Sequence, residues 1–246
     1  MKRKVALVTG ASSGIGSALV PRLGEAGYDV MAAGRDTART REVCERSANV
    51  EPWVGDISFA EACAELIAAC VAKFGRLDLL VNNAGIYRPA NAEGTSDDDW
   101  QQTIATNLSA AFWLSRGAMP HLRDARGVII NIASDWGLAG GKDAVAYCAS
   151  KGGLVLMSKA MALDHAHEGV RVNAICPGDV DTPMLYEEGA ARGLDADQAL
   201  REAAKASPTG KVTRPEEVAA LVAFLASDAA RQITGAAIPI DGGNTA

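Results

Sequence analysis

The sequence predicts an α/β protein in which a doubly wound, parallel sheet of about seven strands carries helices on both faces. Two observations support this fold. Short segments rich in Val, Ile and Leu alternate with helical patterns along the chain, and they lack strict polar–apolar alternation, as is typical of strands buried on both faces. Repetition of strand, helix and strand also favours parallel pairing through right-handed crossovers.

The expected strands are short apolar segments, and they are KVALVT, DVMAA, the VEPWV region, LDLLVNN, GVIINIA, VRVNAIC and AIPI. The helices expected between them cover residues 14–27, 36–47, 58–74, 97–123, 144–168 and 215–227. Residues 179–213 break this alternation with a long stretch of mixed charge. We expect a helical insertion that serves as a substrate lid, and the alternative is a solvated surface excursion.

Length and composition limit the classes of function. The chain has 246 residues, so we expect residues 1–246 to form a single domain. A net charge of -6 argues against nucleic acid as a partner, because phosphate binding needs a basic surface. No signal peptide and no apolar stretch of membrane-spanning length is recognised, which predicts no membrane partner. The five cysteines include no Cys-x-x-Cys pair, and reduced thiols in a cytoplasmic protein are expected.

A glycine-rich turn joins the first strand to the first helix, in the segment VTGASSGIGSAL. Glycines allow a tight turn and close approach of the backbone, and the following helix N-terminus offers N–H groups to a pyrophosphate. With a strand before it and a helix after it, this motif predicts a dinucleotide cofactor. The candidate cofactor-binding residues in the turn are Gly10, Ser12, Ser13, Gly14, Ile15 and Gly16.

The choice of cofactor depends on the end of the second strand, which reads AAGRD. Arg35 follows Gly34 there, and a guanidinium matches the 2′-phosphate of NADP(H). Asp36 is expected to cap the next helix, although a loop shifted by a residue or two would let it bind the two ribose hydroxyls of NAD(H). The sequence therefore favours NADP(H) over NAD(H).

A tyrosine and a lysine four residues apart, Tyr147 and Lys151, stand in the segment AYCASKGG. On the expected helix 144–168 they lie one turn apart on the same face. The strand GVIINIAS ends at Ser134, and the carboxyl ends of parallel strands share one crevice with the glycine turn. These three side chains are therefore expected to meet there. Taken alone, the pair is better interpreted as a packed tyrosine with an exposed lysine.

The order of several motifs resolves this ambiguity. TGASSGIG, NNAG at Asn82–Gly85, Ser134 thirteen residues before Tyr147, the Tyr-x-x-x-Lys pair and CPG at Cys176–Gly178 follow one another. From Lys4 to about Gly243, the chain resembles the classical short-chain dehydrogenase/reductase family. The resemblance implies a Rossmann-type fold, a nicotinamide cofactor and oxidoreductase activity.

The same resemblance implies four catalytic roles. Tyr147 would be the general acid/base, and a nearby ammonium and the positive nicotinamide ring would lower the pKa of its phenol. Lys151 would supply that ammonium and bind the nicotinamide ribose. Ser134 would polarise the substrate oxygen. Asn107, which stands in a helix-like segment, would hold a water that links Lys151 to solvent.

Further positions match the family's cofactor site. By resemblance, Asp56 and Ile57 would bracket the adenine, and Asn83, Ala84 and Gly85 would lie along the adenine ribose, with a simple strand-ending turn as the alternative for NNAG. The residues that would support the nicotinamide are Pro177, Gly178, Val180 and Thr182. Ser13 stands where many NADP-preferring relatives carry a basic residue, so the expected preference depends on Arg35.

Candidate substrate residues are those expected near the catalytic serine and in the insertion, namely Asp135, Trp136, Tyr87, Asp179, Met184 and Tyr186. Asp135 could bind a hydroxyl or amine, or be an exposed loop carboxylate. The cluster Asp164–Glu168 contains His-x-His, which points the rings to different helix faces, so no metal site is expected.

These observations predict an enzyme that transfers a hydride between a nicotinamide cofactor and a small secondary alcohol or ketone, such as a polyol or sugar. One alternative is a reductase of 3-oxoacyl-type substrates. An alternative of another class is a dinucleotide-binding sensor without turnover. The resemblance further implies a homotetramer in which helices 97–123 and 144–168 pack between subunits.

Overall fold

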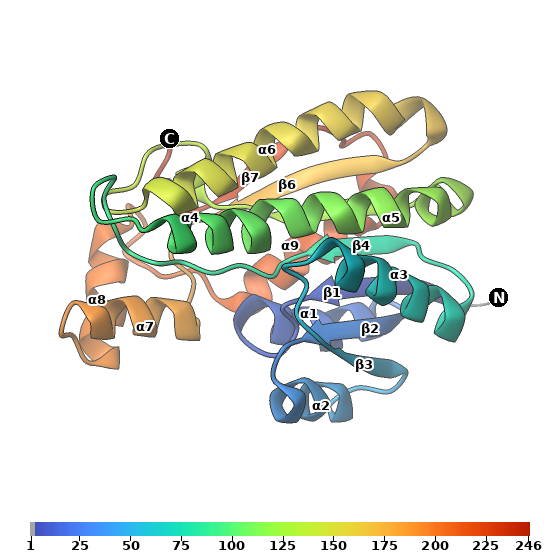
Figure 1. Cartoon of the computed structure of the whole chain (residues 1–246), viewed down its shortest axis with the longest axis horizontal. Coiled ribbons are helices and arrows are strands. Elements are labelled where there is room, and N and C mark those ends of the chain that lie inside the picture. Colours follow the sequence, from blue (N-terminus) through green and yellow to red (C-terminus); the bar gives the residue numbers. More distant parts are fainter. Residues whose placement is uncertain (1–2) are drawn as a thin grey trace.

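The computed structural model describes residues 3–246 and contains a seven-stranded parallel sheet in the order β3-β2-β1-β4-β5-β6-β7 (Figure 1). The predicted fold is confirmed. The strands are β1 (Lys4–Thr9), β2 (Tyr28–Gly34), β3 (Val50–Val54), β4 (Leu79–Asn82), β5 (Val128–Ile132), β6 (Arg171–Pro177) and β7 (Ala237–Ile240). Their central members are almost fully buried, which explains the continuous apolar runs in the sequence.

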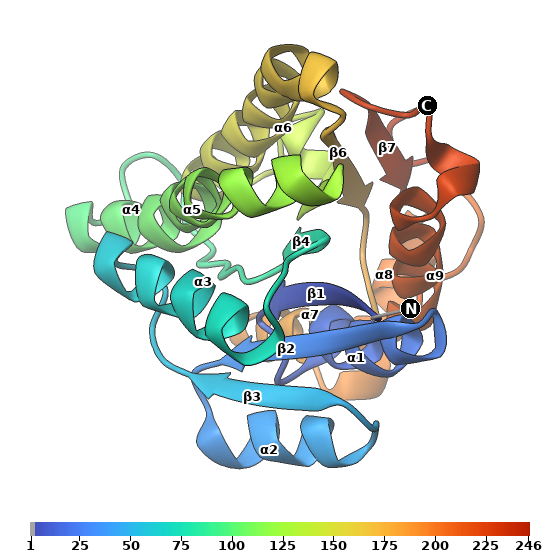
Figure 2. The same ribbon diagram turned by 90° about the vertical axis from the view of Figure 1, so that its right-hand side faces the viewer.

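Helices cover both faces of the sheet (Figure 2). On one face α1 (Gly14–Glu25), α2 (Thr37–Glu45) and α9 (Pro215–Ala226) enclose one hydrophobic cluster. On the other face, α3 (Ala60–Phe74), α5 (Ala110–Ala125) and α6 (Val145–His165) enclose a second one. Each helix turns an apolar stripe toward the strands, so burial of these stripes holds the layers together.

Proline occurs inside both edge strands. Pro52 lies in β3 and Pro239 in β7, the two outer strands of the sheet. A proline lacks the N–H that a central strand must donate to a neighbour, so an edge is the position that tolerates it. The VEPWV segment is therefore compatible with a strand only at this place in the sheet.

The expected helix 97–123 is interrupted in the structure. It consists of α4 (Asp97–Ile104), a π-helical turn (Ala105–Ser109) and α5. A π-turn inserts an extra residue and re-aims the side chains within it, and such turns are frequent at functional sites. Asn107 lies at the centre of this turn and is buried.

The insertion at residues 179–213 folds into two packed helices, α7 (Pro183–Ala191) and α8 (Ala196–Ala206), between β6 and α9. Figure 1 shows them together beyond one end of the sheet, beside the carboxyl ends of the strands. The helical character expected for this segment is thus present, and a lid role remains a prediction.

The chain changes direction at the centre of the sheet. It runs outward from β1 to β3 and then returns to place β4 on the other side of β1. In open parallel sheets, such a switch point leaves a crevice outside the carboxyl ends of the strands. The loops after β1, β4 and β5 meet there, and they carry most of the candidate site residues.

Candidate active site

The glycine turn has the backbone geometry of a phosphate cradle. Gly10 and Gly14 have φ values of 64° and 52°, a region that favours glycine. A Cβ added at Gly16 would overlap the carbonyl oxygen of Gly10, so a side chain there would fill the turn. Ser13 is the N-cap of α1, and its side chain makes no capping hydrogen bond. These residues fit a pyrophosphate at the helix N-terminus.

The NNAG segment braces this turn from the neighbouring strand. The hydroxyl of Thr9 accepts hydrogen bonds from the backbone N–H groups of Asn83 (3.0 Å) and Ala84 (3.1 Å). The side-chain amide of Asn83 donates to the carbonyls of Thr9 (2.9 Å) and Gly10 (3.2 Å). The Asn83 side chain therefore has a structural partner, and the segment is a strand-ending turn locked to the glycine turn.

The end of β2 presents a cation beside the glycine turn. A Cβ at Gly34 would lie 3.2 Å from the Cβ of Ser12, so the two loops are in contact. Within residues 3–246, the exposed Arg35 forms no ion pair. Asp36 is the N-cap of α2 and accepts a hydrogen bond of 3.0 Å from the backbone of Arg39, so the helix-cap interpretation is confirmed.

The remaining cofactor candidates surround the same turn. Asp56 and the buried Ile57 lie in the loop after β3, one residue beyond its end, and the Asp56 carboxylate accepts from the backbone of Ser58. A Cβ at Gly14 would lie 3.0 Å from the Thr182 methyl group, which brings the segment after β6 against the glycine turn. In this segment, Pro177 ends β6, Gly178 packs against Asp241, and Val180 bridges to Thr213.

Tyr147 and Lys151 form a close pair on the first turns of α6, as predicted. The ammonium of Lys151 lies 5.6 Å from the centroid of the Tyr147 ring. Lys151 is only 3% exposed, and its Nζ donates a hydrogen bond of 2.8 Å to the carbonyl of Ile132, the last residue of β5. The alternative of an exposed lysine is therefore wrong, because this amine is anchored against the sheet.

Burial changes the proton affinity of both groups. It lowers the pKa of the Lys151 ammonium from 10.5 to about 8, because the charged form loses its water. Burial also raises the pKa of the Tyr147 phenol well above its ordinary value, while hydrogen bonding with Ser134 opposes the rise and the charge of Asp135 adds to it. The residues of the chain thus do not produce the expected lowering of the phenol pKa.

Asn107 clamps the loop that follows β4. Its side-chain oxygen accepts from the backbone N–H of Ile86 at 2.8 Å, and its Nδ2 donates to the Ile86 carbonyl at 2.9 Å. Nδ2 also lies 3.1 Å from the hydroxyl of Ser150, which in turn donates to the Tyr147 carbonyl. A Cβ at Gly85 would lie 3.4 Å from Lys151 Nζ and 3.5 Å from Asn107 Oδ1, so the three residues are neighbours.

Three aromatic rings form one wall of the site. The ring centroids of Tyr87 and Tyr147 are 5.1 Å apart, those of Tyr87 and Trp136 are 5.6 Å apart, and those of Trp136 and Tyr147 are 6.1 Å apart. These separations and tilted ring planes are typical of favourable aromatic packing. We call Tyr87, Trp136 and Tyr147 the aromatic wall.

Asp135 is held beside the catalytic serine rather than exposed on a loop. It is 5% exposed, and its Oδ1 accepts from the Ser134 hydroxyl at 2.9 Å and from the Trp136 backbone at 2.8 Å. Its Oδ2 accepts from the side chain of Asn244 at 2.8 Å. The C-terminal segment thus reaches the active site, although Asn244 belongs to no motif that sequence reasoning could identify.

The insertion adds further charge near this wall. The pKa of Asp179 is raised by partial loss of solvent and by the charge of Asp135, and the pKa of Glu188 is raised by burial and by the charge of Asp179. Burial raises the pKa of Tyr87 to about 12, the charge of Glu188 adds to this rise, and Arg192 opposes it. Glu188 is therefore close enough to Tyr87 to act on its proton affinity. Glu188 and Arg192 were not predicted from the sequence, because only the helical fold of the insertion turns them this way.

The other predicted substrate residues have different neighbours. The Tyr186 hydroxyl donates to Asp181, so this ring is paired within the insertion and not with the aromatic wall. Met184 lies partly buried on α7. In the histidine cluster, His165 pairs with Glu168, which also binds Arg123. Within residues 3–246, no three or more His, Cys, Asp or Glu side chains come together in a way that could hold a metal ion, and none of the helices combines the length and apolar character needed to cross a membrane.

Comparisons with known proteins agree with this geometry. A family model described as "Enoyl-(Acyl carrier protein) reductase" matches residues 10–245. The L-fucose dehydrogenase of Bos taurus is 41% identical over 98% of this chain and 88% of that protein, and the meso-2,3-butanediol dehydrogenase of Serratia marcescens is 38% identical over 99% and 95%. A single-substitution variant of the actinorhodin polyketide ketoreductase, solved with NADPH, superimposes with a TM-score of 0.93 at 34% identity, covering 98% of this chain and 97% of its own.

The order of the sheet, the glycine turn and the Tyr147–Lys151 pair lead to the same conclusion as these similarities. The chain belongs to the short-chain dehydrogenase/reductase family and is an NAD(P)-dependent oxidoreductase that acts on CH–OH groups.

Proposed function

We propose that this enzyme interconverts a secondary alcohol and a ketone on a neutral, polyhydroxylated small molecule such as a polyol or a sugar, with NADP(H) preferred over NAD(H). The observation that carries the proposal is the aromatic wall around Tyr147, with the carboxylate of Asp135 held beside it through Ser134 and Trp136. Apolar ring faces can pack against the C–H groups of a sugar, while carboxylates accept hydrogen bonds from its hydroxyls. The similarity to an L-fucose dehydrogenase supports this class of substrate.

Four residues carry the chemistry in this proposal. In the oxidative direction, Tyr147 Oη takes the proton of the substrate hydroxyl while the carbon gives up its hydride. The oxidised nicotinamide cofactor, when bound, would accept that hydride. Ser134 would turn its hydroxyl from Asp135 toward the substrate oxygen and polarise it. The ammonium of Lys151, 5.6 Å from the Tyr147 ring centroid, would stabilise the tyrosinate together with the positive nicotinamide ring, and its pKa of about 8 lets it exchange a proton near neutral pH.

Asn107 helps to position the residues around Lys151. It holds the main chain of Ile86 by two hydrogen bonds and lies next to Lys151 across Gly85. A water bound at this polar junction would connect the lysine to solvent, as the family resemblance implies.

The cofactor preference depends on Arg35. Its guanidinium has no carboxylate partner within residues 3–246 and lies in the loop that contacts Ser12. Asp36 is engaged as a helix cap, which leaves no acidic side chain at this position for the two hydroxyls of an NAD(H) ribose. The ketoreductase structure with NADPH supports the same preference.

A 3-oxoacyl-type reductase is the second candidate. The description of the matching family model and the similarity to a polyketide ketoreductase favour it. The carboxylate of Asp135 beside the site and the net charge of -6 oppose it where the acyl group is delivered by a strongly anionic carrier protein. A sensor without turnover is not retained, since the chain belongs to a family of enzymes.

The test is the change in nicotinamide absorbance with polyols, sugars and 3-oxoacyl thioesters, each with both cofactors. We expect turnover with a polyol or sugar and NADP(H), and none in Tyr147→Phe. Turnover confined to the thioesters would replace the proposal by the second candidate. Turnover that persists in Tyr147→Phe would refute the assignment of the acid/base.

We further propose that α7 and α8 form a lid. The two helices pack on each other and are joined by an ion pair between Arg192 and Glu202, while Glu188 reaches toward the aromatic wall. Hydrogen exchange in residues 183–206 should slow when NADPH and substrate are both added. Exchange that is unchanged by both ligands would contradict a lid.

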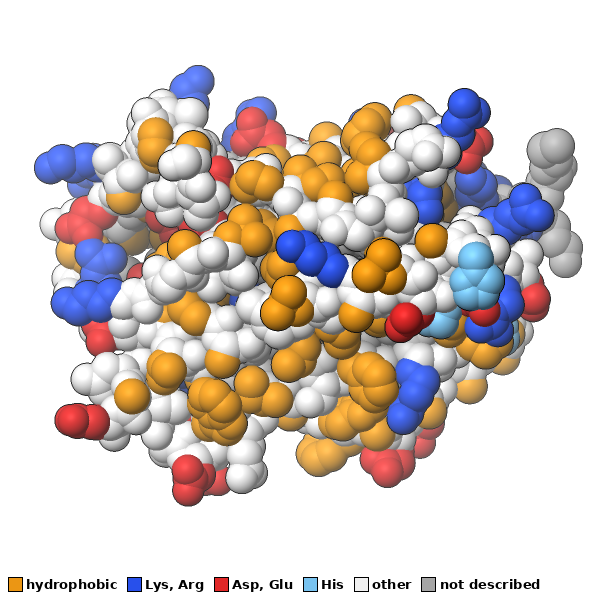
Figure 3. All heavy atoms as spheres, turned by 90° about the horizontal axis from the view of Figure 1, so that it is seen from above, with side chains coloured by type: hydrophobic (Ala, Val, Ile, Leu, Met, Phe, Trp, Pro, Cys, Tyr) orange, Lys and Arg blue, Asp and Glu red, His pale blue; other side chains and the backbone are white. Residues whose placement is uncertain are grey.

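We also propose a homotetramer in the cytoplasm. Large apolar side chains remain exposed on α4, α5 and α6, with Leu163 at 83% and Leu156 at 67%. Figure 3 views the molecule from above, the α6 side of Figure 1, and shows hydrophobic side chains spread over that face. A second copy would cover this face. The five cysteines are free thiols, as is usual in the reducing cytoplasm.

Light scattering tests the assembly. The substitutions Leu156→Glu and Leu163→Glu should lower the mass of the oligomer, whereas Lys205→Glu, at an exposed position on α8 away from this face, should not. A monomeric wild-type protein would exclude the tetramer.

A further inference from the structure

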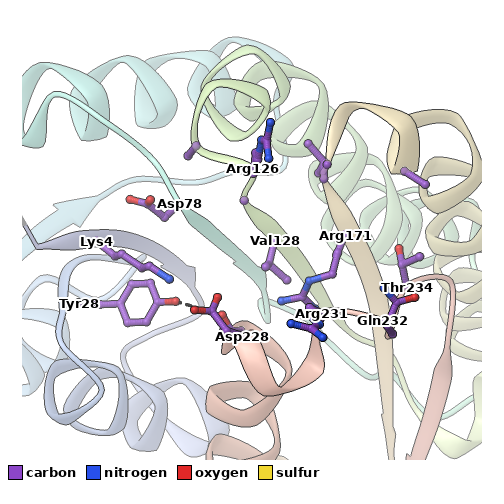
Figure 4. Close-up of a pocket in the computed structure, with 16 residues that line it drawn as sticks. Lys4, Tyr28, Asp78, Arg126, Val128, Arg171, Asp228, Arg231, Gln232 and Thr234 are labelled. Atoms are coloured by element: carbon purple, nitrogen blue, oxygen red, sulfur yellow. Dashed lines mark hydrogen bonds between the residues drawn. The ribbon is translucent and has the colours of Figure 1, made fainter.

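A cavity of about 370 Å³ lies at the opposite end of the sheet from the active site (Figure 4). Its lining includes Lys4, Tyr28, Val128 and Arg171, which are the first residues of β1, β2, β5 and β6. Ser134 and the glycine turn follow the last residues of their strands, so the cavity is separate from the crevice that holds the catalytic group. Its volume suits a small metabolite.

Positive charge is concentrated in this cavity. Four basic side chains line it, and they are Lys4, Arg126, Arg171 and Arg231. Within residues 3–246, none of the four forms an ion pair. The chain as a whole carries a net charge of -6, so this local excess of cations is not a consequence of composition.

The two carboxylates in the lining do not neutralise these cations. Asp78 is already bound by Arg76 through hydrogen bonds of 2.8 and 2.5 Å, and it also accepts from the backbone of Val5 at 2.8 Å. Asp228 is exposed and lies close enough to Arg171 to influence its proton affinity, but forms no ion pair with it. The cavity therefore keeps an excess of positive charge.

Arg171 is the most constrained of the four cations. Its side chain is partly buried, and its guanidinium donates to the carbonyls of Ile233 and Ser227, both at 3.3 Å. These two long hydrogen bonds leave other N–H donors of the guanidinium available. Figure 4 shows Arg171 and Arg231 extending toward the same part of the cavity. Lys4 and Tyr28 enter it from β1 and β2.

Like charges that share a cavity repel one another, most strongly around the partly buried Arg171, and an anion between them would remove that cost. A guanidinium matches the geometry of carboxylate and phosphate oxygens. We propose that this cavity binds a small polyanion, a molecule with two or more carboxylate or phosphate groups, with Arg171, Arg231 and Lys4 as its main ligands. Asp228 opposes the anion and limits its affinity.

Calorimetric titration of the full chain at low salt tests the proposal, with citrate as the carboxylate probe and inorganic pyrophosphate as the phosphate probe. We expect at least one of them to saturate with a Kd below about 1 mM. Arg231→Gln should weaken that binding about tenfold or more, because the substitution removes a charged donor. Saturation by citrate alone would assign carboxylates, and saturation by pyrophosphate alone would assign phosphates.

Two further variants make the test specific. Asp228→Asn removes a negative charge at an exposed position and should tighten binding by a few-fold, an effect that partial unfolding cannot produce. Arg116→Gln on α5, whose guanidinium packs over Phe112 away from the cavity, should leave binding unchanged. Pyrophosphate could also bind the glycine turn, and such binding would be insensitive to Arg231→Gln and Asp228→Asn. That insensitivity, or no saturation by either probe at about 10 mM, would overturn the proposal.

Discussion

Replacement of Lys151 by methionine should abolish turnover and yet stabilise the fold at neutral pH. The ammonium of Lys151 is 3% exposed, and burial lowers its pKa from 10.5 to about 8. Each pKa unit corresponds to ~1.4 kcal/mol, so the charged form costs the folded state about 3 kcal/mol near pH 7. Methionine has a similar length and volume and carries no charge.

The substitution also removes a favourable contact. Lys151 Nζ donates to the carbonyl of Ile132 at 2.8 Å, and loss of this donor costs about 1–2 kcal/mol. The net gain in the free energy of unfolding at pH 7 is therefore about 1–2 kcal/mol, which corresponds to a Tm about 2–8 °C higher for a domain of this size.

The pH dependence separates the charge from other effects of the substitution. Between about pH 8 and pH 10.5, the unfolded chain retains the lysine proton while the folded protein releases it. The wild-type protein therefore gains stability as pH rises through this window. Lys151→Met lacks that gain, so its advantage should be near zero at about pH 9.5.

The assay is urea unfolding of both proteins at the two pH values, with Lys159→Met as the control. Lys159 is exposed on the same helix, so its replacement should change the free energy of unfolding by less than about 0.5 kcal/mol at either pH. A Lys151→Met protein that is less stable than wild type by the same amount at both pH values would show that the buried ammonium carries no penalty.

Three other substitutions test the cofactor site and the π-turn. Gly16→Ala places a methyl group against the Gly10 carbonyl and should weaken NADP(H) binding at least about tenfold in a fluorescence titration; binding equal to wild type would contradict the cradle. Arg35→Leu should lower kcat/KM for NADPH about tenfold or more, because it removes a charged hydrogen bond to the 2′-phosphate. The kcat/KM for NADH should stay nearly unchanged. Equal losses for both cofactors would exclude 2′-phosphate recognition. Asn107→Leu removes both hydrogen bonds to Ile86, so chemical denaturation should show a free energy of unfolding about 2 kcal/mol lower, and steady-state assays should show a lower kcat; wild-type values of both would contradict the clamp.

Much of the fold follows from local patterns in the sequence. The apolar runs predict every strand, and the strand–glycine–helix order predicts the phosphate cradle, because glycine adopts φ values such as the 64° of Gly10 at the least cost. The spacing of Tyr147 and Lys151 predicts that they share a helix face, since four residues nearly complete a turn. These features depend on neighbours within the same segment.

Other features depend on segments that are far apart along the chain. The π-turn at Asn107 is not visible in the sequence, because its side chain is directed by partners on Ile86 and Ser150 in two other elements. The link from Asn244 to Asp135 joins residues separated by 109 positions, and no motif connects them.

Proton affinity is likewise a tertiary property. The sequence identifies Lys151 as an amine near Tyr147, but the pKa of about 8 arises because packing against the sheet removes water from the ammonium. The sequence by itself thus determined the fold class and which residues could do chemistry. Only the tertiary structure decided how each is charged, held and surrounded, because desolvation and long-range hydrogen bonds exist only once the layers have packed.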